Sequence, residues 1–508
     1  MNHKLLFGLL AALFGLLPTH AEVDLNYEAG LTLNAGDHTL APYYITANRY
    51  GTVTQQYGTQ LNASLFHRMD TTSRFSWGAG VEVWGGWTSS TSYLNLADPA
   101  NPVAHNEHPA RVWLQQVFGE VKYRGLMVIA GAKHRGSPLL NDMLSSGDLV
   151  HSANARPMPG LTAGFVNFQN VPFTRGWLQI AGEIGYYKPA DTKWLEHHYN
   201  YANHFLTTGT WFHYKNIYFR THPMKPVVLT LGMQAACQFG GDYVTYQNGT
   251  PTRTIHQESN AKAFWKAFIP GSGSSNTGDK YYEGNHVGSW DIRLDWHINP
   301  AHTLRAFHQH LWEDGSGIGF RNGFDGLWGI EYKAWKPAWV SGATIEYIDL
   351  TNQSGPIHWA PKDHAGTPLT DEATGADDYY NNYAFNGYQN RGMAIGSPMV
   401  KGTIHNRDGY LRFTDNRIRG FHVALCGDLS TVLSYRAMAG YRKSWGTPFE
   451  PRVKPASDTS WMLEATYKAP RQFQLKAQIA GDHGTLYGNN FGCLLSISYN
   501  GLFTLGKK

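Results

Sequence analysis

Two stretches of the sequence combine aromatic rings with amide, imidazole and guanidinium groups. They run from residue 194 to residue 215 and from residue 377 to residue 391. Carbohydrate sites stack the apolar face of a sugar on Trp or Tyr and bind its hydroxyl groups through Asn, Asp, Arg, Gln or His. The alternative is that these side chains form an aromatic girdle and bond loops to one another. We predict carbohydrate contacts from Trp194, His197, His198, His213, Tyr380, Asn382, Tyr388 and Arg391.

The histidines raise the question of a metal site. His197 and His198 are adjacent, and His105 and His108 form a second close pair. A zinc site needs three or four ligands at a defined geometry with a fixed second shell, which adjacent histidines on a loop do not specify. The sequence contains no G-x-S-x-G elbow, and the acidic pair at 377–378 does not by itself identify an acid–base couple. We therefore predict no metal, no cofactor and no enzymatic activity.

Residues 145–160 form a third distinctive segment, SSGDLVHSANARPMPG. Pro157 and Pro159 fix the backbone at its end, and its polar residues are small or able to bond the backbone. These features suit a constrained loop that folds into a lumen or lies over its mouth. We predict that this segment is a structural plug, with Asn154 and Arg156 among its residues.

Strand-like alternation predicts the scaffold that positions these loops. Between residues 290 and 299, Trp and aliphatic side chains occupy one face and Asp, Arg and His occupy the other. This period of two extends over a whole membrane-spanning length. Similar alternation occurs at residues 178–186, 433–442, 461–468 and 473–479. A soluble sheet also alternates, but it must cover its apolar face with a second layer, and no long amphipathic helix is evident.

Connection lengths indicate a barrel with two different ends. Short basic turns are predicted at 122–125, 333–337 and 468–471, whereas other connections are long and polar. Short turns at one end and long extracellular loops at the other are typical of outer-membrane barrels. A hairpin with one short turn and one long loop takes about 50–55 residues, so this chain predicts roughly 18 strands. We expect an all-β fold, a transmembrane antiparallel β-barrel.

Composition agrees with a barrel wall without requiring one. Charged residues make up 16% of the chain, below the typical ~25%, whereas aromatic residues make up 14%. Outward apolar faces, inward polar faces and aromatic girdles produce this mixture. A large secreted β-sandwich or propeller would also be rich in aromatic residues and glycine, so composition leaves that alternative open. The net charge of +4 is too small and too scattered to indicate nucleic acid.

The N-terminus has the pattern of a secretory signal peptide. Lys4 precedes an apolar run from Leu5 to Leu17, and Thr19-His20-Ala21 has the small-x-small form that signal peptidase accepts. The run is too short to span a bilayer as a helix, which needs ~20 residues. We predict a signal peptide at residues 1–21, a barrel at residues 22–508, and location in the outer membrane. The three cysteines are widely spaced and do not predict a particular disulfide.

Three stretches resemble the Wzi family of outer-membrane capsule-assembly proteins, in the form found among Bacteroidetes. They are residues 144–159, with LSSG followed by SANARPMP; residues 213–220, HYKNIYFR; and residues 380–398, with YNNY followed by GYQNRGMAIGSP. The first is fairly specific, and the other two are short aromatic and polar patterns. The enterobacterial form has an extra periplasmic helical part, whereas strand-like sequence begins here at Val23.

The resemblance implies a non-enzymatic surface lectin that attaches capsular or surface polysaccharide to the cell. The expected partners are that polysaccharide and outer-membrane lipid, with no nucleic acid. A competing hypothesis is a porin-like channel for sugars or small solutes, in which polar inward faces line an open lumen. An exporter of lipid or polysaccharide would need a lateral opening or a partner protein, and nothing in the sequence identifies either.

Overall fold

The fold was analysed in a computed structural model of the chain. It describes residues 23–109, 111–270, 283–313, 315–355, 358–359, 373–374 and 377–505. The predicted signal peptide, residues 1–21, lies outside the described residues. Within the described part of the chain, no helix is both long and apolar enough to cross a membrane.

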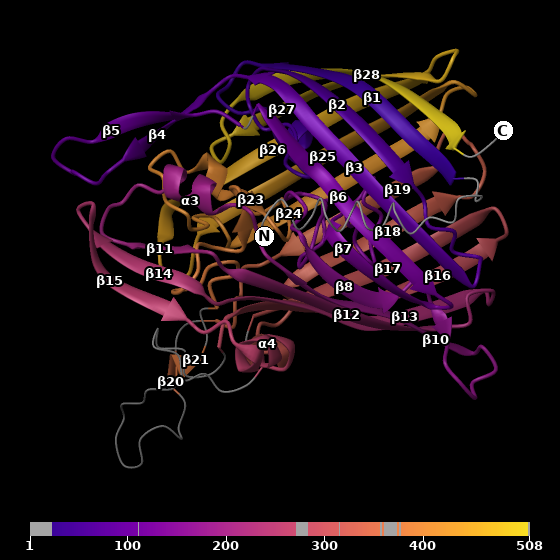
Figure 1. Cartoon of the computed structure of the whole chain (residues 1–508), viewed down its shortest axis with the longest axis horizontal. Coiled ribbons are helices and arrows are strands. Elements are labelled where there is room, and N and C mark those ends of the chain that lie inside the picture. The colour runs from indigo at the N-terminus through magenta and orange to yellow at the C-terminus, as the bar shows by residue number, and fades with distance from the viewer. Residues whose placement is uncertain are drawn as a thin grey trace.

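A closed antiparallel β-barrel forms the body of the molecule (Figure 1). Each wall strand pairs with the next wall strand along the chain, and the last strand pairs with the first from Val23↔Leu505 to Gly36↔Gly492. Because β8 and β9 both pair with β10, they share one position, and the wall has the 18 strands predicted from chain length. The wall strands are β1 (Val23–Gly36), β2 (Gly58–His67), β3 (Phe75–Thr88), β6 (Val112–Tyr123), β7 (Leu126–Ala132), β8 (Gly160–Phe165), β9 (Gln169–Asn170), β10 (Leu178–Tyr187), β12 (Trp211–Thr221), β13 (Val227–Phe239), β16 (Asn285–Asn299), β17 (His302–Trp312), β18 (Gly326–Ala334), β19 (Gly342–Asp349), β24 (Ile418–Asp428), β25 (Leu433–Gly446), β26 (Pro451–Lys468), β27 (Phe473–Gly484) and β28 (Asn490–Leu505).

The two faces of β16 show how the wall meets its surroundings. Ile292, Leu294 and Trp296 are 42%, 42% and 50% exposed on the outer face, as the alternation predicted. Asp291 and Asp295, at alternate positions of the strand, are buried on the inner face. The same outward display of large apolar side chains recurs around the wall, at Leu61, Leu231, Ile345, Leu463 and Leu495 among others. An apolar outer band around a closed barrel is the surface that a lipid bilayer covers, so the protein resides in the outer membrane.

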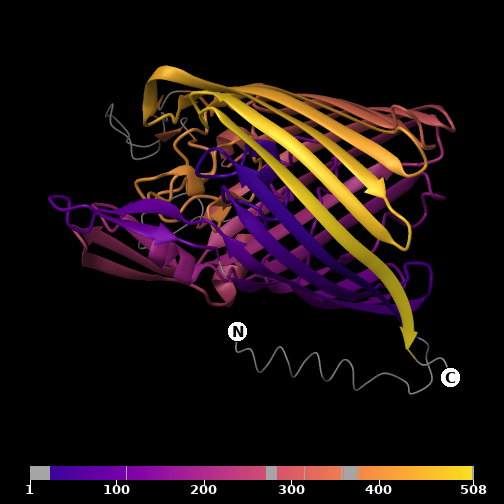
Figure 2. The ribbon, with the colours of Figure 1, turned by 90° about the horizontal axis from the view of Figure 1, so that it is seen from above.

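The barrel ends differ in the length of their connections, as predicted. At the end where β1 begins and β28 ends, neighbouring strands are joined by short turns, including residues 124–125 between β6 and β7 and residues 469–472 between β26 and β27. Arg124 and Arg471 have positive φ angles of 54° and 61°, which tight turns require. At the opposite, outer end, several connections reach tens of residues and carry their own secondary structure (Figure 2), although residues 447–450 and 485–489 form short turns there. By the asymmetry of outer-membrane barrels, the short turns are periplasmic and the long loops extracellular.

Several small elements form the outer part of the molecule. The hairpin of β4 and β5 and the sheet of β11, β14 and β15 extend beyond the barrel at this end, and α3 lies beside them (Figure 1). The elements outside the wall are α2 (Tyr43–Thr46), β4 (Thr91–Asn95), β5 (Val103–Glu107), α3 (Thr192–His198), β11 (Phe205–Thr208), β14 (Gly241–Gln247), β15 (Thr250–Gln257), α4 (Ala261–Phe268), α5 (Gly315–Ile318), β20 (His358–Trp359), β21 (Ala373–Thr374), β22 (Gln389–Asn390), β23 (Met393–Ala394) and the 3₁₀ turn η1 (Thr403–His405).

Candidate functional site

Three loop segments enter the lumen and pack against one another, and we call them together the plug. They are residues 37–57 after β1, 133–159 after β7 and 377–417 before β24. The backbone N–H of Tyr50 donates to the carbonyl of Ala153 at 2.6 Å, and that of Ser152 donates to the carbonyl of Ile395 at 2.9 Å. Residues 145–160, predicted as a plug from sequence, therefore form the middle of a larger structure.

The plug has a hydrophobic core of its own that continues into the barrel wall. Leu149 and Val150 from one segment and Tyr380 and Tyr388 from another are fully buried together with the inward-facing Phe212 of β12. The hydroxyl of Tyr388 donates to the carbonyl of Val150 at 2.8 Å, and that of Tyr380 donates to the carbonyl of Leu149. Apolar burial combined with satisfied hydroxyl groups makes this part of the lumen a packed interior rather than a water-filled passage.

Asp148 anchors the plug to the wall. Its carboxylate accepts hydrogen bonds from the side-chain amides of Gln234 in β13, at 3.0 Å, and Gln309 in β17, at 2.9 Å. It also accepts from the backbone N–H groups of Val150 and His151, so it fixes the local turn as well. A buried carboxylate needs this many donors to offset its loss of hydration. The plug is thus held by specific polar contacts in addition to apolar packing.

A cavity of about 410 Å³ lies at the outer end, above the plug, and we call it the outer pocket. Its walls come from the β1–β2 loop, the β4–β5 hairpin, α3 and both long plug segments. It combines aromatic, amide, imidazole and cationic side chains. The lining residues are Gly51, Thr54, Gln55, Tyr93, Asn106, Glu107, His108, Pro109, Arg156, Lys193, Trp194, His197, Asn390, Arg391, Met393 and Ile404.

Helix α3 brings Trp194 and His197 to this pocket. Its Leu195 is buried with Tyr199, Leu206 and Leu411 in a small second core, which fixes the inner side of the helix. Trp194 lies partly exposed and stacks on His198, with ring centroids 4.4 Å apart and planes at 19°. The opposite wall, the β4–β5 hairpin, is tied to the plug because the hydroxyl of Tyr93 donates to the carbonyl of Ile404 at 2.7 Å.

Two arginines give the outer pocket a positive floor. The guanidinium of Arg156 lies 4.5 Å from the ring centroid of Trp113, and none of the described carboxylates lies within salt-bridge distance of it. Burial, with a smaller effect from the nearby Arg391, lowers the pKa of Arg156 to about 9. Burial also lowers the pKa of Arg391, although Asp191 opposes this. Two neighbouring arginines with few carboxylates close to them favour the binding of an anionic group.

The sequence-predicted residues separate into three groups in the structure. Trp194, His197 and Arg391 line the outer pocket, together with Arg156 from the predicted plug. His198 lies directly behind the pocket wall, fully buried, and Asn382 is half-buried, with its amide oxygen accepting from the backbone of Ala384 at 2.8 Å. The remaining three residues are buried: Tyr380 and Tyr388 lie in the lumen, as does the predicted plug residue Asn154, whereas His213 lies on the outer face of β12 beneath α4, with its ring 6.0 Å from that of Phe268.

Burial corrects the role of four of the predicted contact residues. Tyr380 and Tyr388 hold plug segments together, and His198 bonds to Glu107, so none of these rings presents a face to solvent. His213 lies in β12, which begins at Trp211, so the predicted loop of residues 194–215 ends at Thr210. Tyr380 and Tyr388 pack within the plug, His198 packs between α3 and β5, and His213 packs between β12 and α4. Asn154 has the same kind of role, since its amide donates to the carbonyl of Ala394 at 3.0 Å.

Sequence reasoning missed several lining residues. Tyr93 and Lys193 carry no local signal that separates them from other surface residues. Asn390 falls within a predicted stretch but was not singled out. Glu107 lies between His105 and His108, which form a close pair of histidines in the sequence. That pair was the only sequence feature that could have pointed to this wall of the pocket.

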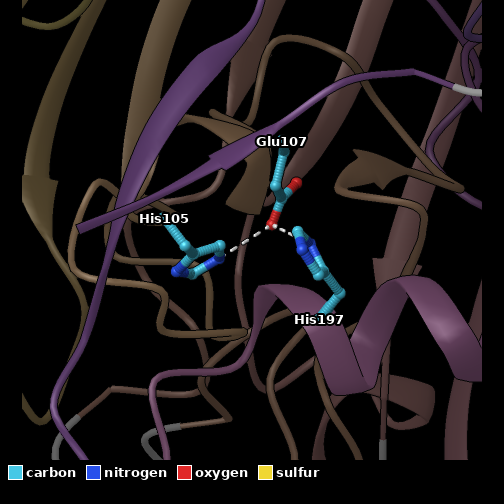
Figure 3. A group of neighbouring side chains, drawn as sticks. All are labelled: His105, Glu107 and His197. Atoms are coloured by element: carbon cyan, nitrogen blue, oxygen red, sulfur yellow. Dashed lines mark ion pairs between the residues drawn. The ribbon is translucent and has the colours of Figure 1, made fainter. Parts of the chain in front are cut away.

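A group of imidazole and carboxylate side chains lies in the same wall. Figure 3 shows His105 and Glu107, both from β5, facing His197 of α3. The Oε1 atom of Glu107 is 3.5 Å from Nε2 of His105, 3.7 Å from Nδ1 of His197 and 2.9 Å from Nδ1 of His198. Imidazole nitrogens and a carboxylate oxygen are ligand types that first-row divalent metals accept.

Comparison with known proteins identifies the fold. The solved structure of Wzi from Escherichia coli, described as an outer-membrane protein involved in group 1 capsule assembly and as a carbohydrate-binding β-barrel, aligns over 94% of this chain and 84% of its own, with 12% identity and a TM-score of 0.56. OccAB2 of Acinetobacter baumannii aligns over 94% and 98% with 9% identity and a TM-score of 0.47. OpdK of Pseudomonas aeruginosa, solved with vanillate, aligns over 95% and 99% with 10% identity and a TM-score of 0.45. No family model and no curated protein matches the sequence.

The likeness to Wzi at this identity is a likeness of fold. It agrees with the β-barrel architecture of this chain. The fold is that of an outer-membrane barrel, and its function depends on the residues of this chain.

Proposed function

We propose that this protein is a surface lectin of the outer membrane that attaches capsular or surface polysaccharide to the cell. The observation that carries the proposal is the outer pocket, in which a partly exposed Trp194, two arginines and several amide and imidazole groups converge above a packed plug. An indole face and hydrogen-bonding groups on one concave surface are what a pyranose ring requires. The resemblance of three sequence stretches to the Wzi family supports the same role.

The charge of the pocket favours an acidic polymer. Arg156, Lys193 and Arg391 line it, with Glu107 as the acidic residue on the opposite wall. A planar guanidinium binds a carboxylate through two parallel hydrogen bonds, which gives both affinity and orientation. A polysaccharide that carries carboxyl groups would therefore bind more tightly than a neutral one, and its binding would weaken with salt.

A binding assay with purified protein and acidic capsular polysaccharide tests the proposal. Trp194→Ala should weaken binding about fivefold, since a stacked aromatic contributes on the order of 1 kcal/mol. Arg391→Ala should weaken it about tenfold or more, because hydrogen bonds to charged groups contribute ~1.5–3 kcal/mol. Trp265→Ala is the matched control: Trp265 is a 60% exposed indole on α4, also in an extracellular loop, and it does not line the pocket.

The cellular counterpart of this assay follows the polymer itself. Cells that lack the protein should make capsule but release it into the medium, and the Trp194→Ala, Arg391→Ala double variant should do the same. Unchanged surface capsule in the deletion strain would refute the lectin proposal. Shedding in the deletion strain but not in the double variant would leave the function standing and reject these contact residues.

A porin-like channel is the second candidate, and one observation favours it. A cavity of about 430 Å³ lies inside the barrel beside the plug, lined by polar residues that include Arg135, Glu183, Asn216 and Arg220. A wide passage would have to continue past the packed plug. We expect little conductance in planar bilayers, and large stable channels in the wild-type protein would favour transport over binding.

A further inference from the structure

The hairpin of β4 and β5 meets α3 at the edge of the outer pocket, through side chains that can also bind a metal ion. His105 and Glu107 come from the hairpin and His197 from the helix, and their ligand atoms all lie within 4.8 Å of one another (Figure 3). Glu107 and His197 are 90 positions apart in sequence, and their two elements come together at the edge of the outer pocket.

His105 is the least satisfied member of this group. Both of its ring nitrogens are buried, and neither forms a hydrogen bond with any described residue. The ring lies against Tyr93, at 6.3 Å between centroids, and against the edge of His197, at 4.9 Å and 86°. Buried polar atoms in folded proteins nearly always have a partner, which is protein, water or an ion. Here Nε2 of His105 lies 3.5 Å from Oε1 of Glu107, a carboxylate oxygen of the type that binds metals.

We propose that His105, Glu107 and His197 bind a divalent metal ion of the zinc type, which fastens the outer hairpin to α3. In a tetrahedral site with bonds of about 2.0–2.1 Å, ligand atoms lie about 3.3 Å apart. The separations of 3.5 Å and 3.7 Å from Glu107 Oε1 are close to this value, and the two imidazoles, whose ligand atoms lie within 4.8 Å of each other, would have to move closer by side-chain rotation. His197 has room for such a rotation because its side chain is 57% exposed.

The surroundings supply the second shell that a metal site needs. His198, fully buried, lies 2.9 Å from Glu107 Oε1 through Nδ1, and it is held in place by stacking on Trp194. Such a contact orients a ligating carboxylate. Glu107 and His197 both line the outer pocket, so the fourth coordination position faces that cavity and is accessible to water or to a glycan hydroxyl.

The ligand types select among metals. Two imidazoles and one carboxylate suit zinc and its first-row neighbours, whereas Ca²⁺ and Mg²⁺ prefer six or more oxygen ligands or several waters. The site should therefore bind Zn²⁺ and Co²⁺ and should not respond to Ca²⁺. Binding should also add a metal link between two outer elements that already meet through the contact of Glu107 with His198.

Titration of the detergent-purified full-length protein with ZnCl₂ after chelator treatment tests the proposal. We expect one tightly bound Zn²⁺ per chain, loss of binding of at least tenfold in His105→Ala and in His197→Ala, and the intense visible absorption of a tetrahedral site when Co²⁺ replaces Zn²⁺. The control is His256→Ala: His256 is an exposed histidine that bonds to Asp242 at 2.7 Å in the β14–β15 hairpin, and its removal should leave binding unchanged.

A second measurement separates metal binding from misfolding and from the lectin proposal. Zn²⁺ should slow proteolysis of the β4–β5 hairpin in the wild-type protein but not in His105→Ala, while both proteins keep the heat-modifiable mobility of a folded barrel. Equal Zn²⁺ binding by wild type and by both histidine variants, or no binding by wild type, would overturn the proposal. Glycan affinity is measured in parallel with and without chelator, so failure of the lectin proposal is recorded independently.

Discussion

Two arginine substitutions on one face of β16 give a quantitative test of the membrane position. Leu294 and Ile298 both point outward, with 42% and 48% of their surfaces exposed. Leu294 lies five residues before Asn299, where the periplasmic turn begins. With a rise of about 3.3 Å per residue and a tilt near 40°, it is about 13 Å above that turn, close to the middle of a band about 25 Å tall. Ile298 lies about 10 Å nearer the interface on the same estimate.

The difference in depth sets the expected difference in free energy. Leu294→Arg should destabilise the inserted barrel by about 2–4 kcal/mol, whereas Ile298→Arg should cost about 0–1 kcal/mol, because an arginine near the interface reaches the headgroups. Leu294→Met keeps an apolar side chain of similar size and is the control. The strand, the face and the introduced charge are the same in both arginine variants, so only depth differs between them.

Urea-dependent folding into lipid vesicles, followed by heat-modifiable electrophoretic mobility, measures both free energies. Equal destabilisation by the two arginines would mean that the exposed apolar face of β16 does not cross the hydrocarbon core at this height. No destabilisation by either would refute the lipid-facing assignment of this strand altogether.

Three further predictions concern the plug and the N-terminus. Asp148→Ala should leave the amide of Gln309 without its acceptor, at about 1–3 kcal/mol for a buried group left unpaired, while the amide of Gln234 keeps its bond to Asp291, and faster amide hydrogen exchange in residues 145–160 would report the loosened plug; unchanged exchange would contradict the anchoring role. Tyr388→Phe removes the bond to the carbonyl of Val150, so thermal unfolding should show a loss of about 1 kcal/mol, while glycan affinity stays within twofold of wild type because the ring is buried; a large loss of affinity would return Tyr388 to the contact set. The mature protein should begin at Glu22 on N-terminal sequencing, and retention of residues 1–21 would reject the signal-peptide prediction.

The barrel wall was predictable because its physical signal is local. The bilayer outside and the polar lumen inside impose a period of two, which is readable at residues 290–299 without knowledge of any partner strand. The same reasoning failed at β12. There Phe212, Tyr214 and Tyr218 point inward and pack against the plug, so aromatic residues occupy the face that the pattern expects to be polar. A filled lumen thus removes the alternation that reveals a strand.

The plug and the outer pocket were predictable only in part because their contacts join distant segments. Two prolines identified residues 145–160 as constrained, but no local feature shows that Asn154 bonds to a residue 240 positions away. Tyr380 and Tyr388 were predicted to stack on sugars because the sequence alone does not show whether a tyrosine side chain is exposed or buried. Glu107 acquires its place in the pocket only when the hairpin folds back onto α3.

The filled lumen bears directly on how the outer pocket binds. Arg156 sits on a plug segment whose backbone is fixed from another segment: its own carbonyl accepts from the amide of Asn390 at 3.0 Å. The side chain of Arg391 in turn donates to the carbonyl of Ala190, just before α3. Each cation is therefore oriented before a ligand arrives, which reduces the conformational entropy lost on binding. A pocket formed by mobile loops would lose more conformational entropy on binding a glycan than a pocket built on a packed plug.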